Sequence, residues 1–244
     1  MTLSRAIGAV GVLALSLLTL AGAGPSTCNR TDTNSTYRPN VDPAAFVPSV
    51  TNPYFPLVPG TKLQYQETSP EGNKTIDVVV THDTKRILGV PCVVVHDTVR
   101  LGSQLKEDTL DWYAQDRDGN VLYFGEATQS YESDGSVNTK GSWEAGVDGA
   151  LPGIIMPATP RVGDPCRQEY YRGKAEDMAQ IVSLSETATV PYGSFSACVK
   201  TRDWSALEPD VVENKWFARG IGQVRAEIVQ GGTGAEELVR VTTE

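Results

Sequence analysis

Short runs of β-branched and aromatic residues, bounded by glycine, proline, asparagine and aspartate, recur from residue 61 to residue 241. Apolar residues do not keep the helical spacing of about 3.6 over three turns anywhere, and only residues 174–180 suit a helix of one or two turns. The pattern predicts an all-β, mainly antiparallel fold with at most one short helix. We expect a strongly twisted sheet that forms a half-barrel or a closed barrel.

The expected strands are Thr61–Thr68, Thr75–Thr81, Pro91–Arg100, Glu107–Asp116, Asn120–Glu126, Gln129–Tyr131, Arg167–Tyr171, Gln180–Val190, Ser196–Trp204, Val212–Phe217, Gly222–Gln230 and Glu236–Val241. Residues 116–120 and 133–136 each contain Asp-Gly, a dipeptide that supplies the positive φ needed in tight hairpin turns. Neither a repeat nor a domain boundary is visible, so residues 51–244 are expected to form one β-rich domain.

The N-terminus has the layout of a secretory signal peptide. Arg5 precedes an apolar run from residue 6 to residue 21, and Ala21-Gly22-Ala23 offers a cleavage site of small residues. We therefore expect residues 1–23 to be removed and the protein to be secreted, periplasmic or held in the cell envelope. Residues 24–50, rich in polar residues and proline, are expected to be a flexible arm. A second apolar run of membrane-spanning length, about 20 residues, is not found after the signal peptide.

The formal net charge is −9. An acidic chain repels the phosphates of nucleic acids and anionic lipids, so nucleic acid is not expected as a partner.

Four cysteines follow the signal peptide, at spacings that exclude CxxC metal and redox motifs: Cys28, Cys92, Cys166 and Cys198. In an exported chain they are expected to form disulfides, with three connectivities possible. We favour Cys92–Cys198, since both lie in apolar strand-like runs, which leaves Cys28–Cys166. The alternative for Cys28 is a lipid anchor, although the preceding Pro25-Ser26-Thr27 matches a lipidation motif poorly.

Residues 144–165 interrupt the strand pattern with four glycines and four prolines. They are expected to form one long loop, which either covers a sheet edge or barrel end or acts as a lid over a ligand cavity. Its apolar side chains would not be placed in water without a reason. Together with flanking aromatics they are the ligand-binding candidates: Trp143, Leu151, Ile154, Ile155, Met156 and Tyr170.

Carboxylates beside aromatic rings are typical of glycoside-cleaving sites, where one acid and one base or nucleophile work as a pair. Glu107, Asp108, Asp111 and Glu126 lie near such rings, and the catalytic candidates are Glu144, Asp148 and Glu169. The same carboxylates also suit the solvated surface of an acidic protein.

The remaining motifs give no cofactor or metal site. A GxSxG motif is not present. His82 and His96 lie at expected strand ends with no ligand spacing, and Asp116, Asp118 and Asn120 depart from a calcium loop because glycine and glutamate are misplaced. We expect neither a cofactor nor a metal.

Two motifs carry a resemblance to a known group. Asn52-Pro53-Tyr54-Phe55-Pro56-Leu57-Val58-Pro59-Gly60 opens the expected domain, and Lys215-Trp216-Phe217-Ala218-Arg219-Gly220-Ile221-Gly222-Gln223-Val224 lies near its end. Both resemble motifs in an uncharacterised family of secreted proteins and lipoproteins of actinobacteria and proteobacteria, as do residues 111–116 and 142–149. The resemblance implies a β-rich, half-barrel envelope protein, similar in outline to carriers of apolar ligands, and implies no catalytic residue.

Three functions remain open. The favoured hypothesis is an extracytoplasmic binding protein for a lipid or other small apolar ligand. The alternatives are a structural or interaction module of the cell envelope without a small ligand, and a carboxylate-dependent extracellular hydrolase or lyase. A cavity lined by aliphatic and aromatic residues favours the first, and converging carboxylates, one with a raised pKa, favour the enzyme.

Overall fold

The computed structural model describes residue 28, residues 37–163 and residues 165–244. Over these residues the chain is almost entirely antiparallel sheet, and its single helix is the short 3₁₀ helix η1 (Pro43–Ala45). The strands are β1 (Phe46–Val47), β2 (Thr61–Ser69), β3 (Gly72–Ile87), β4 (Val90–Leu101), β5 (Gln104–Asp116), β6 (Val121–Tyr131), β7 (Val137–Asn138), β8 (Trp143–Glu144), β9 (Leu151–Met156), β10 (Pro165–Arg167), β11 (Glu169–Tyr170), β12 (Asp177–Val190), β13 (Gly193–Ser205), β14 (Val212–Ala218), β15 (Gly222–Gln230) and β16 (Ala235–Thr243).

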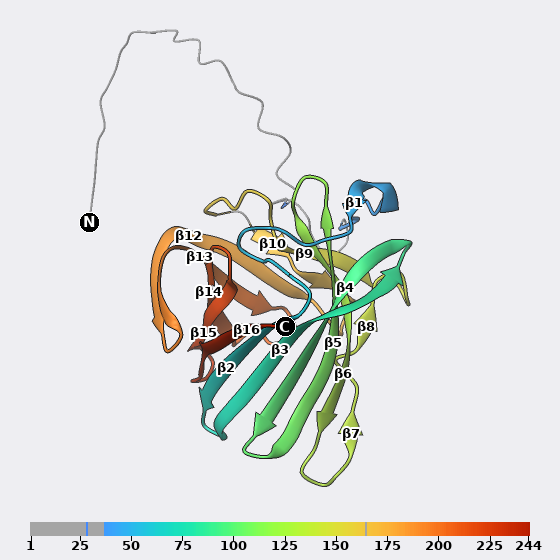
Figure 1. Ribbon diagram of the computed structural model, residues 1–244. Coiled ribbons are helices and arrows are strands. Elements are labelled where there is room, and N and C mark those ends of the chain that lie inside the picture. The colour runs from blue at the N-terminus through green and yellow to red at the C-terminus, as the bar shows by residue number, and fades with distance from the viewer. Residues whose placement is uncertain (1–27, 29–36, 164) are drawn as a thin grey trace, which may run out of the picture.

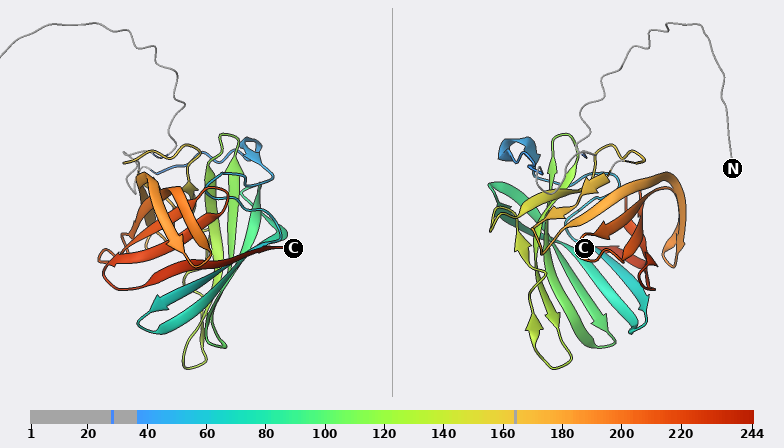
Figure 2. Two further views of the ribbon diagram at one scale, coloured as in Figure 1. Left: turned by 60° about the vertical axis from the view of Figure 1, so that its left-hand side comes forward. Right: turned by 180° about the vertical axis from the view of Figure 1, so that it is seen from behind.

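Thirteen of these strands form one continuous sheet in the order β10-β12-β13-β14-β15-β16-β2-β3-β4-β5-β6-β9-β11. The short strands β1, β7 and β8 pair with β5 or β6 beside this path. The sheet curves round so that the β12–β15 wall faces the β2–β6 wall (Figure 1 and Figure 2). The result is a nearly closed barrel, which confirms the predicted all-β, antiparallel fold. The two Asp-Gly hairpin turns are also present, closed by Gly119 N–H···O=C Asp116 and Gly135 N–H···O=C Glu132.

The barrel closes through one stretch of chain, residues 165–170. Its first half, β10, pairs with β12, and its second half, β11, pairs with β9, with only Gln168 between them. Gln168 is 5% exposed, and its N–H donates to the carbonyl of Asp177. The two edge strands of the sheet, β10 and β11, therefore follow one another directly in the chain, and we call residues 165–170 the seam.

Gly153 of β9 lies directly against the seam. A Cβ atom added to Gly153 would overlap the backbone of Arg167 and Gln168. Glycine is thus required here by a close approach of two backbones rather than by a positive φ.

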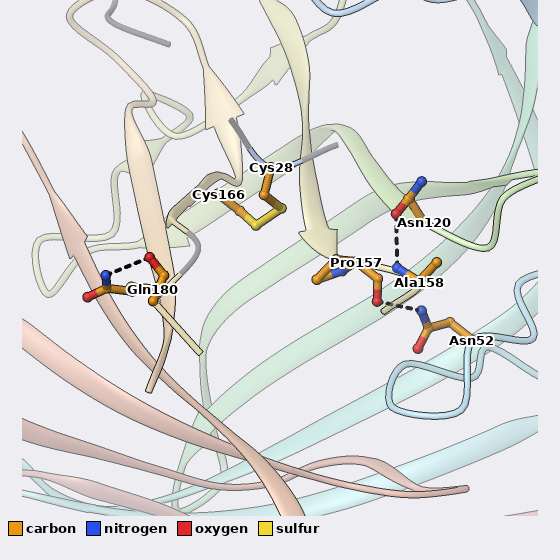
Figure 3. The surroundings of a disulfide bond; sticks show 8 residues. Cys28, Asn52, Asn120, Pro157, Ala158, Cys166 and Gln180 are labelled. Atoms are coloured by element: carbon orange, nitrogen blue, oxygen red, sulfur yellow. Dashed lines mark hydrogen bonds between the residues drawn. A yellow bond between two sulfur atoms is a disulfide. The ribbon is translucent and has the colours of Figure 1, made fainter. Parts of the chain in front are cut away.

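A disulfide joins the N-terminal segment to the seam. The Cys28–Cys166 bond links residues 138 positions apart and attaches Cys28 to β10 (Figure 3). This pairing is the one predicted for these two cysteines. It engages the Cys28 sulfur, and the same sulfur cannot also carry a thioether-linked lipid.

The predicted Cys92–Cys198 disulfide is wrong. Both cysteines are free and fully buried. Cys92 lies on β4 and packs with Trp112 and Phe124, whereas Cys198 lies on β13 and packs with Trp216 and Leu238. The strand order places β4 and β13 on opposite walls of the barrel, so apolar surroundings alone did not imply a pair.

Core side chains cover both faces of the sheet along β4. Val93 and Val95 point into the barrel and pack with Val80, Ile181 and Phe217 in what we call the Val80 cluster. Val94 points outward and packs in a second group, the Trp112 cluster, with Trp112 and Phe124. Three consecutive valines are consequently buried. Burial of apolar surface on both faces holds the wall in place.

Residues 144–165 differ from the single long loop that we expected. They include β9, which pairs with β6 and with β11, and a tight turn over residues 144–150. Pro152 and Gly153 occur within β9 even though both residue types disfavour regular strands. The close approach to the seam accounts for Gly153, and the carbonyl of Pro152 accepts a hydrogen bond from the hydroxyl of Tyr37.

The described part of the expected flexible arm is packed on the barrel. Tyr37 donates its hydroxyl hydrogen to the carbonyl of Pro152, β1 pairs with β5, and Val50 is 2% exposed. Asp42 caps η1 by accepting a hydrogen bond from Ala44 N–H. The predicted signal peptide, residues 1–23, and most of residues 24–36 lie outside the described residues. Within the described part of the chain, helical structure with the length and apolar character of a membrane span is not found.

Candidate functional site

Two cavities adjoin each other and share Gln168 and Lys215 in their walls. The first, which we call the Phe55 cavity, has a volume of about 230 Å³. Most of its wall is aliphatic or aromatic, and the wall consists of Phe55, Pro56, Leu57, Leu63, Tyr65, Val78, Val95, Asp97, Asp111, Tyr113, Ile155, Gln168, Lys215, Phe217, Ile221, Gly222, Gln223 and Glu236. Such a wall, with a few polar groups among apolar ones, is typical of small-molecule sites.

The two motifs that carry the family resemblance meet beside this cavity. Gly220 N–H donates to the carbonyl of Pro53 (2.7 Å), and the guanidinium of Arg219 lies 5.9 Å from the ring centre of Tyr54. The rings of Phe55 and Phe217 lie 6.4 Å apart, and both line the cavity. Two segments distant in sequence thus form one side of the cavity wall.

Three carboxyl groups interrupt the apolar wall of the Phe55 cavity: Asp97 on β4, Asp111 on β5 and Glu236 on β16. In the β4–β5 register Asp97 is paired with Thr109, so Asp111 is its diagonal neighbour on the same face. Diagonal neighbours in an antiparallel pair lie about 7 Å apart. Asp97 Oδ1 is buried without a hydrogen-bond partner.

The other two carboxyl groups each accept a hydrogen bond. Asp111 accepts from the hydroxyl of Tyr123 (2.6 Å), and Glu236 accepts from Nε2 of Gln223 (2.9 Å). Neither bond brings a positive charge to the carboxyl group. The Phe55 cavity therefore contains acids whose hydrogen-bonding partners are neutral.

Burial raises the pKa of all three acids because a charged carboxylate is poorly solvated inside the barrel. Burial, followed by repulsion from Asp111 and Glu236, raises the pKa of Asp97 to about 8. Burial raises the pKa of Asp111 to about 6, against the opposing hydrogen bond from Tyr123. Burial and repulsion from Glu213 raise the pKa of Glu236 to about 7.

Lys215 of β14 lies between the two cavities and is part of both walls. Its Nζ is 3.3 Å from Asp203 Oδ2 and 3.3 Å from Glu213 Oε2. Burial opposes its charge, but these two carboxylates outweigh burial and hold the pKa of Lys215 well above its usual value. Lys215 thus stays charged and is paired with acids of its own wall.

The second cavity, which we call the Trp204 cavity, has a volume of about 360 Å³ and is more polar. It is lined by Gln168, Glu169, Lys174, Asp177, Asp203, Trp204, Ser205, Leu207, Glu208, Val211, Glu213 and Lys215. Burial, then repulsion from Asp177 and Glu126, raises the pKa of Glu169 to about 8. Glu169 also accepts a hydrogen bond from Nε1 of Trp143 (3.0 Å).

The ligand-binding candidates are distributed unevenly around these cavities. Ile155 lines the Phe55 cavity. Trp143, Met156 and Tyr170 are buried in the protein core, Ile154 packs against the Trp112 cluster, and Leu151 pairs with Tyr170 across β9 and β11. Ligand contact by these residues stays a prediction, and Ile155 is the one placed at a cavity wall.

The three catalytic candidates are not brought to one cavity. Glu169 lines the Trp204 cavity, while Glu144 forms an ion pair with Lys85 (2.6 Å) and Asp148 lies in the exposed turn after β8. Asp148 has a positive φ of 50°, as its position in a tight turn requires. The structure therefore separates Glu169 from the other two.

Metal-ligating side chains do not gather in groups of three anywhere in residues 28, 37–163 and 165–244. His96 Nε2 lies 3.0 Å from Asp108 Oδ1, which is a simple surface pair. Asp116 accepts hydrogen bonds from the backbone and side chain of Asn120, and these bonds close the hairpin turn.

Sequence reasoning did not single out Asp97, Lys215 or Glu236, although it noted Asp111 among the carboxylates. One signal was available. Asp97 follows Val93 and Val95 at spacings of two, which places all three on one face of a strand. The sequence did not reveal that this face points into a cavity.

The comparisons with known proteins give no family and no activity. No family model matches the chain, and no curated protein sequence matches it. The chain is similar to a protein of Bacteroides fragilis inferred to be exported and having a YmcC-like fold, with a TM-score of 0.47, 17% identity, and 78% of this chain and 98% of that chain covered. It is also similar to an inferred lipoprotein of Parabacteroides distasonis, with a TM-score of 0.43, 13% identity, and the same shares of 78% and 98%.

Proposed function

We propose that this protein is an extracytoplasmic binding protein for a small molecule with an apolar body, a lipid or another small apolar ligand. The observation that carries the proposal is the Phe55 cavity, an apolar-walled space of about 230 Å³ inside the barrel. Small-molecule sites are commonly apolar pockets with a few placed polar groups, from about 300 Å³ upward. The Phe55 cavity, at about 230 Å³, is smaller than this range, so it suits only a small ligand.

The proposed location outside the cytoplasm has two supports. The N-terminal 23 residues have the charge, apolar run and small-residue site of a secretory signal peptide. The Cys28–Cys166 disulfide fits an oxidising compartment, because disulfides persist there and are rare in the cytosol. The resemblance to secreted proteins and lipoproteins with the same opening motif agrees with this proposal.

A hydrolase or lyase has less support in the site. Glu169 has the raised pKa expected of a general acid. However, carboxylate-dependent cleavage of a glycosidic bond needs a second carboxyl group about 5–9 Å away. Glu144 and Asp148, the predicted partners of Glu169, do not line the cavity that contains it, and the carboxyl groups that do line it are those of Asp177, Asp203, Glu208 and Glu213. A structural module without a ligand would be indicated by an empty cavity in the test below.

The test compares two neighbouring valines of β3. Val78 lines the Phe55 cavity, whereas Val79 is on the opposite face of the same strand. Val78→Phe places a ring in the cavity, and Val79→Phe places the same ring outside it. We would measure binding of the neutral apolar fluorophore N-phenylnaphthylamine to both variants and to the wild type, with circular dichroism as the check of folding.

The expected result is saturable binding to the wild type and to Val79→Phe, with a loss of at least about tenfold in affinity for Val78→Phe, equivalent to about 1.4 kcal/mol. Equal binding by the two variants would show that the fluorophore occupies another place. As a second measurement, native mass spectrometry of protein purified gently from its producing cell would identify the natural ligand. An empty protein that also fails to bind the fluorophore would contradict the proposal.

A further inference from the structure

We infer that the ligand of the Phe55 cavity is a cationic amphiphile, an amine whose protonated nitrogen contacts Asp97 and whose apolar body fills the aromatic and aliphatic part of the wall. This inference rests on the proposed function and adds the charge of the ligand to it. Its basis is the arrangement of Asp97, Asp111 and Glu236 around a space that otherwise has mostly apolar walls.

Asp97 has hydrogen-bonding capacity that no group among the described residues satisfies. Its Oδ1 is buried without a hydrogen-bond partner. A buried acceptor without a partner costs free energy relative to a satisfied one, because it has lost its hydrogen bonds to water. A ligand that donates a hydrogen bond to Asp97 would remove this cost, and an ammonium group donates strongly to carboxylates.

A second feature of the cavity is its charge balance. Asp97, Asp111 and Glu236 are three acids, and among the described residues of the wall Lys215 is the only basic one. Lys215 is already paired with Asp203 and Glu213. A bound cation would therefore balance the negative charge of these acids when they ionise, whereas an anionic ligand such as a fatty acid would add to that charge.

The geometry of the acids favours an amine over a metal ion as the bound cation. Calcium and magnesium need several oxygen ligands within about 2.0–2.6 Å of one point. Among the described residues, acidic side chains do not form such a group. Asp97 and Asp111 are only diagonal neighbours, with a spacing of about 7 Å. An ammonium ion on an apolar stem fits this spacing and the adjacent rings of Phe55 and Tyr113, which lie 5.2 Å apart.

The inference includes a linked proton. At neutral pH the Asp97 carboxyl is largely protonated, because burial and neighbouring acids raise its pKa to about 8. Binding of an ammonium ion favours the ionised carboxylate, so the carboxyl proton passes to solvent and the amine affinity rises from pH 6 to pH 8. The titratable and charged groups around Asp97 are Asp77 on β3, Glu107 and Asp111 on β5, Glu236 on β16, and Tyr65, Tyr113 and Lys215 in the cavity wall.

The experiment uses three ligands with the same tail: octylamine, octanol and octanoate. Each is titrated by calorimetry into the mature protein and into Asp97→Asn, which keeps the size of the side chain but cannot ionise. His96→Asn is the control, because it changes the adjacent residue on the outer face of the same strand. Calorimetry in two buffers of different ionisation enthalpy measures the protons released.

We expect octylamine to bind the wild type at least tenfold more tightly than octanol, with proton release, and octanoate to bind most weakly. Asp97→Asn should abolish the preference for octylamine while octanol binding stays the same, and His96→Asn should retain the preference. If octanol binds as tightly as octylamine, or octanoate binds best, the inference is wrong and the proposed function stands. Displacement of octylamine by equimolar calcium would also overturn it. If none of the three ligands binds, both the inference and the proposed function fail.

Discussion

Replacing Gly153 with alanine tests whether the barrel is closed at the seam. The added Cβ would overlap the backbone of Arg167 and Gln168, and neither backbone can move aside as a flexible side chain would. Overpacking costs about 1–3 kcal/mol, and a backbone clash belongs at the upper end of that range. Alanine also restricts the unfolded chain, which returns about 0.4–1 kcal/mol. We therefore expect Gly153→Ala to lower the free energy of unfolding by about 2 kcal/mol.

The matched control is Gly193→Ala in β13. Gly153 and Gly193 both lie in strands without a positive φ, but the Cβ of an alanine at 193 would have its nearest neighbour, the Cζ of Phe195, at 4.0 Å. This substitution is expected to raise the free energy of unfolding slightly, by up to about 1 kcal/mol. For a chain of this length, 1 kcal/mol changes the melting temperature by about 2–4 °C.

Thermal melting followed by circular dichroism distinguishes the two variants. Gly153→Ala should melt about 4–8 °C below the wild type, and Gly193→Ala at or slightly above it. If Gly153→Ala melts at the wild-type temperature, β9 does not approach the seam closely. The sheet would then be an open half-barrel at this point, and the argument for closure would be refuted.

Three further predictions concern cysteines and pH. Reduction of the Cys28–Cys166 bond should lower the free energy of unfolding by up to about 5 kcal/mol, because the bond closes a loop of more than 100 residues; urea unfolding with and without reductant measures this, and Cys166→Ser should make the protein insensitive to reductant. In the native protein Cys92 and Cys198 should resist iodoacetamide, because both are buried and burial raises the pKa of the Cys92 thiol to about 12. Peptide mass spectrometry should find both cysteines alkylated only after denaturation. If both stay unalkylated after denaturation without reductant, they form the second disulfide after all. The pKa of Asp97 is raised by folding, from about 3.9 in an unfolded chain to about 8, so its contribution to stability is complete below about pH 4 and is lost as the pH rises through 8. The urea midpoint of the wild type should fall across this window, that of Asp97→Asn should fall less, and parallel curves would contradict the assigned burial.

Much of the fold could be predicted because turn chemistry is local. The Asp-Gly dipeptides at residues 118–119 and 134–135 marked hairpin turns that the structure contains. β9 was missed because Pro152 and Gly153 both disfavour strands, and the requirement for Gly153 comes from a contact with residues 167–168 that no local pattern reports. Local sequence therefore indicated the hairpins, and long-range packing decided β9.

The candidate site was harder to predict, for a different physical reason. Alternation along a strand shows which residues share a face, but it identifies the inner face only when the other face is polar. Val93, Val94 and Val95 are all buried, so β4 has no polar face that would mark Asp97 as an inward residue. The predicted Cys92–Cys198 disulfide was wrong for a similar reason. Whether two cysteines meet depends on the order of the strands in the sheet, which the apolar character of each strand does not show.

The strand order has a consequence for how the chain assembles. β2 is the first long strand to be synthesised, and its neighbours are β3, which follows at once, and β16, which is the last. One side of β2 thus has no partner until the C-terminus is available. Contacts between the ends of a chain slow folding, and an unpaired strand edge invites association with other chains. We expect refolding to be slow and its yield to fall as protein concentration rises, even though the finished barrel leaves neither side of β2 exposed.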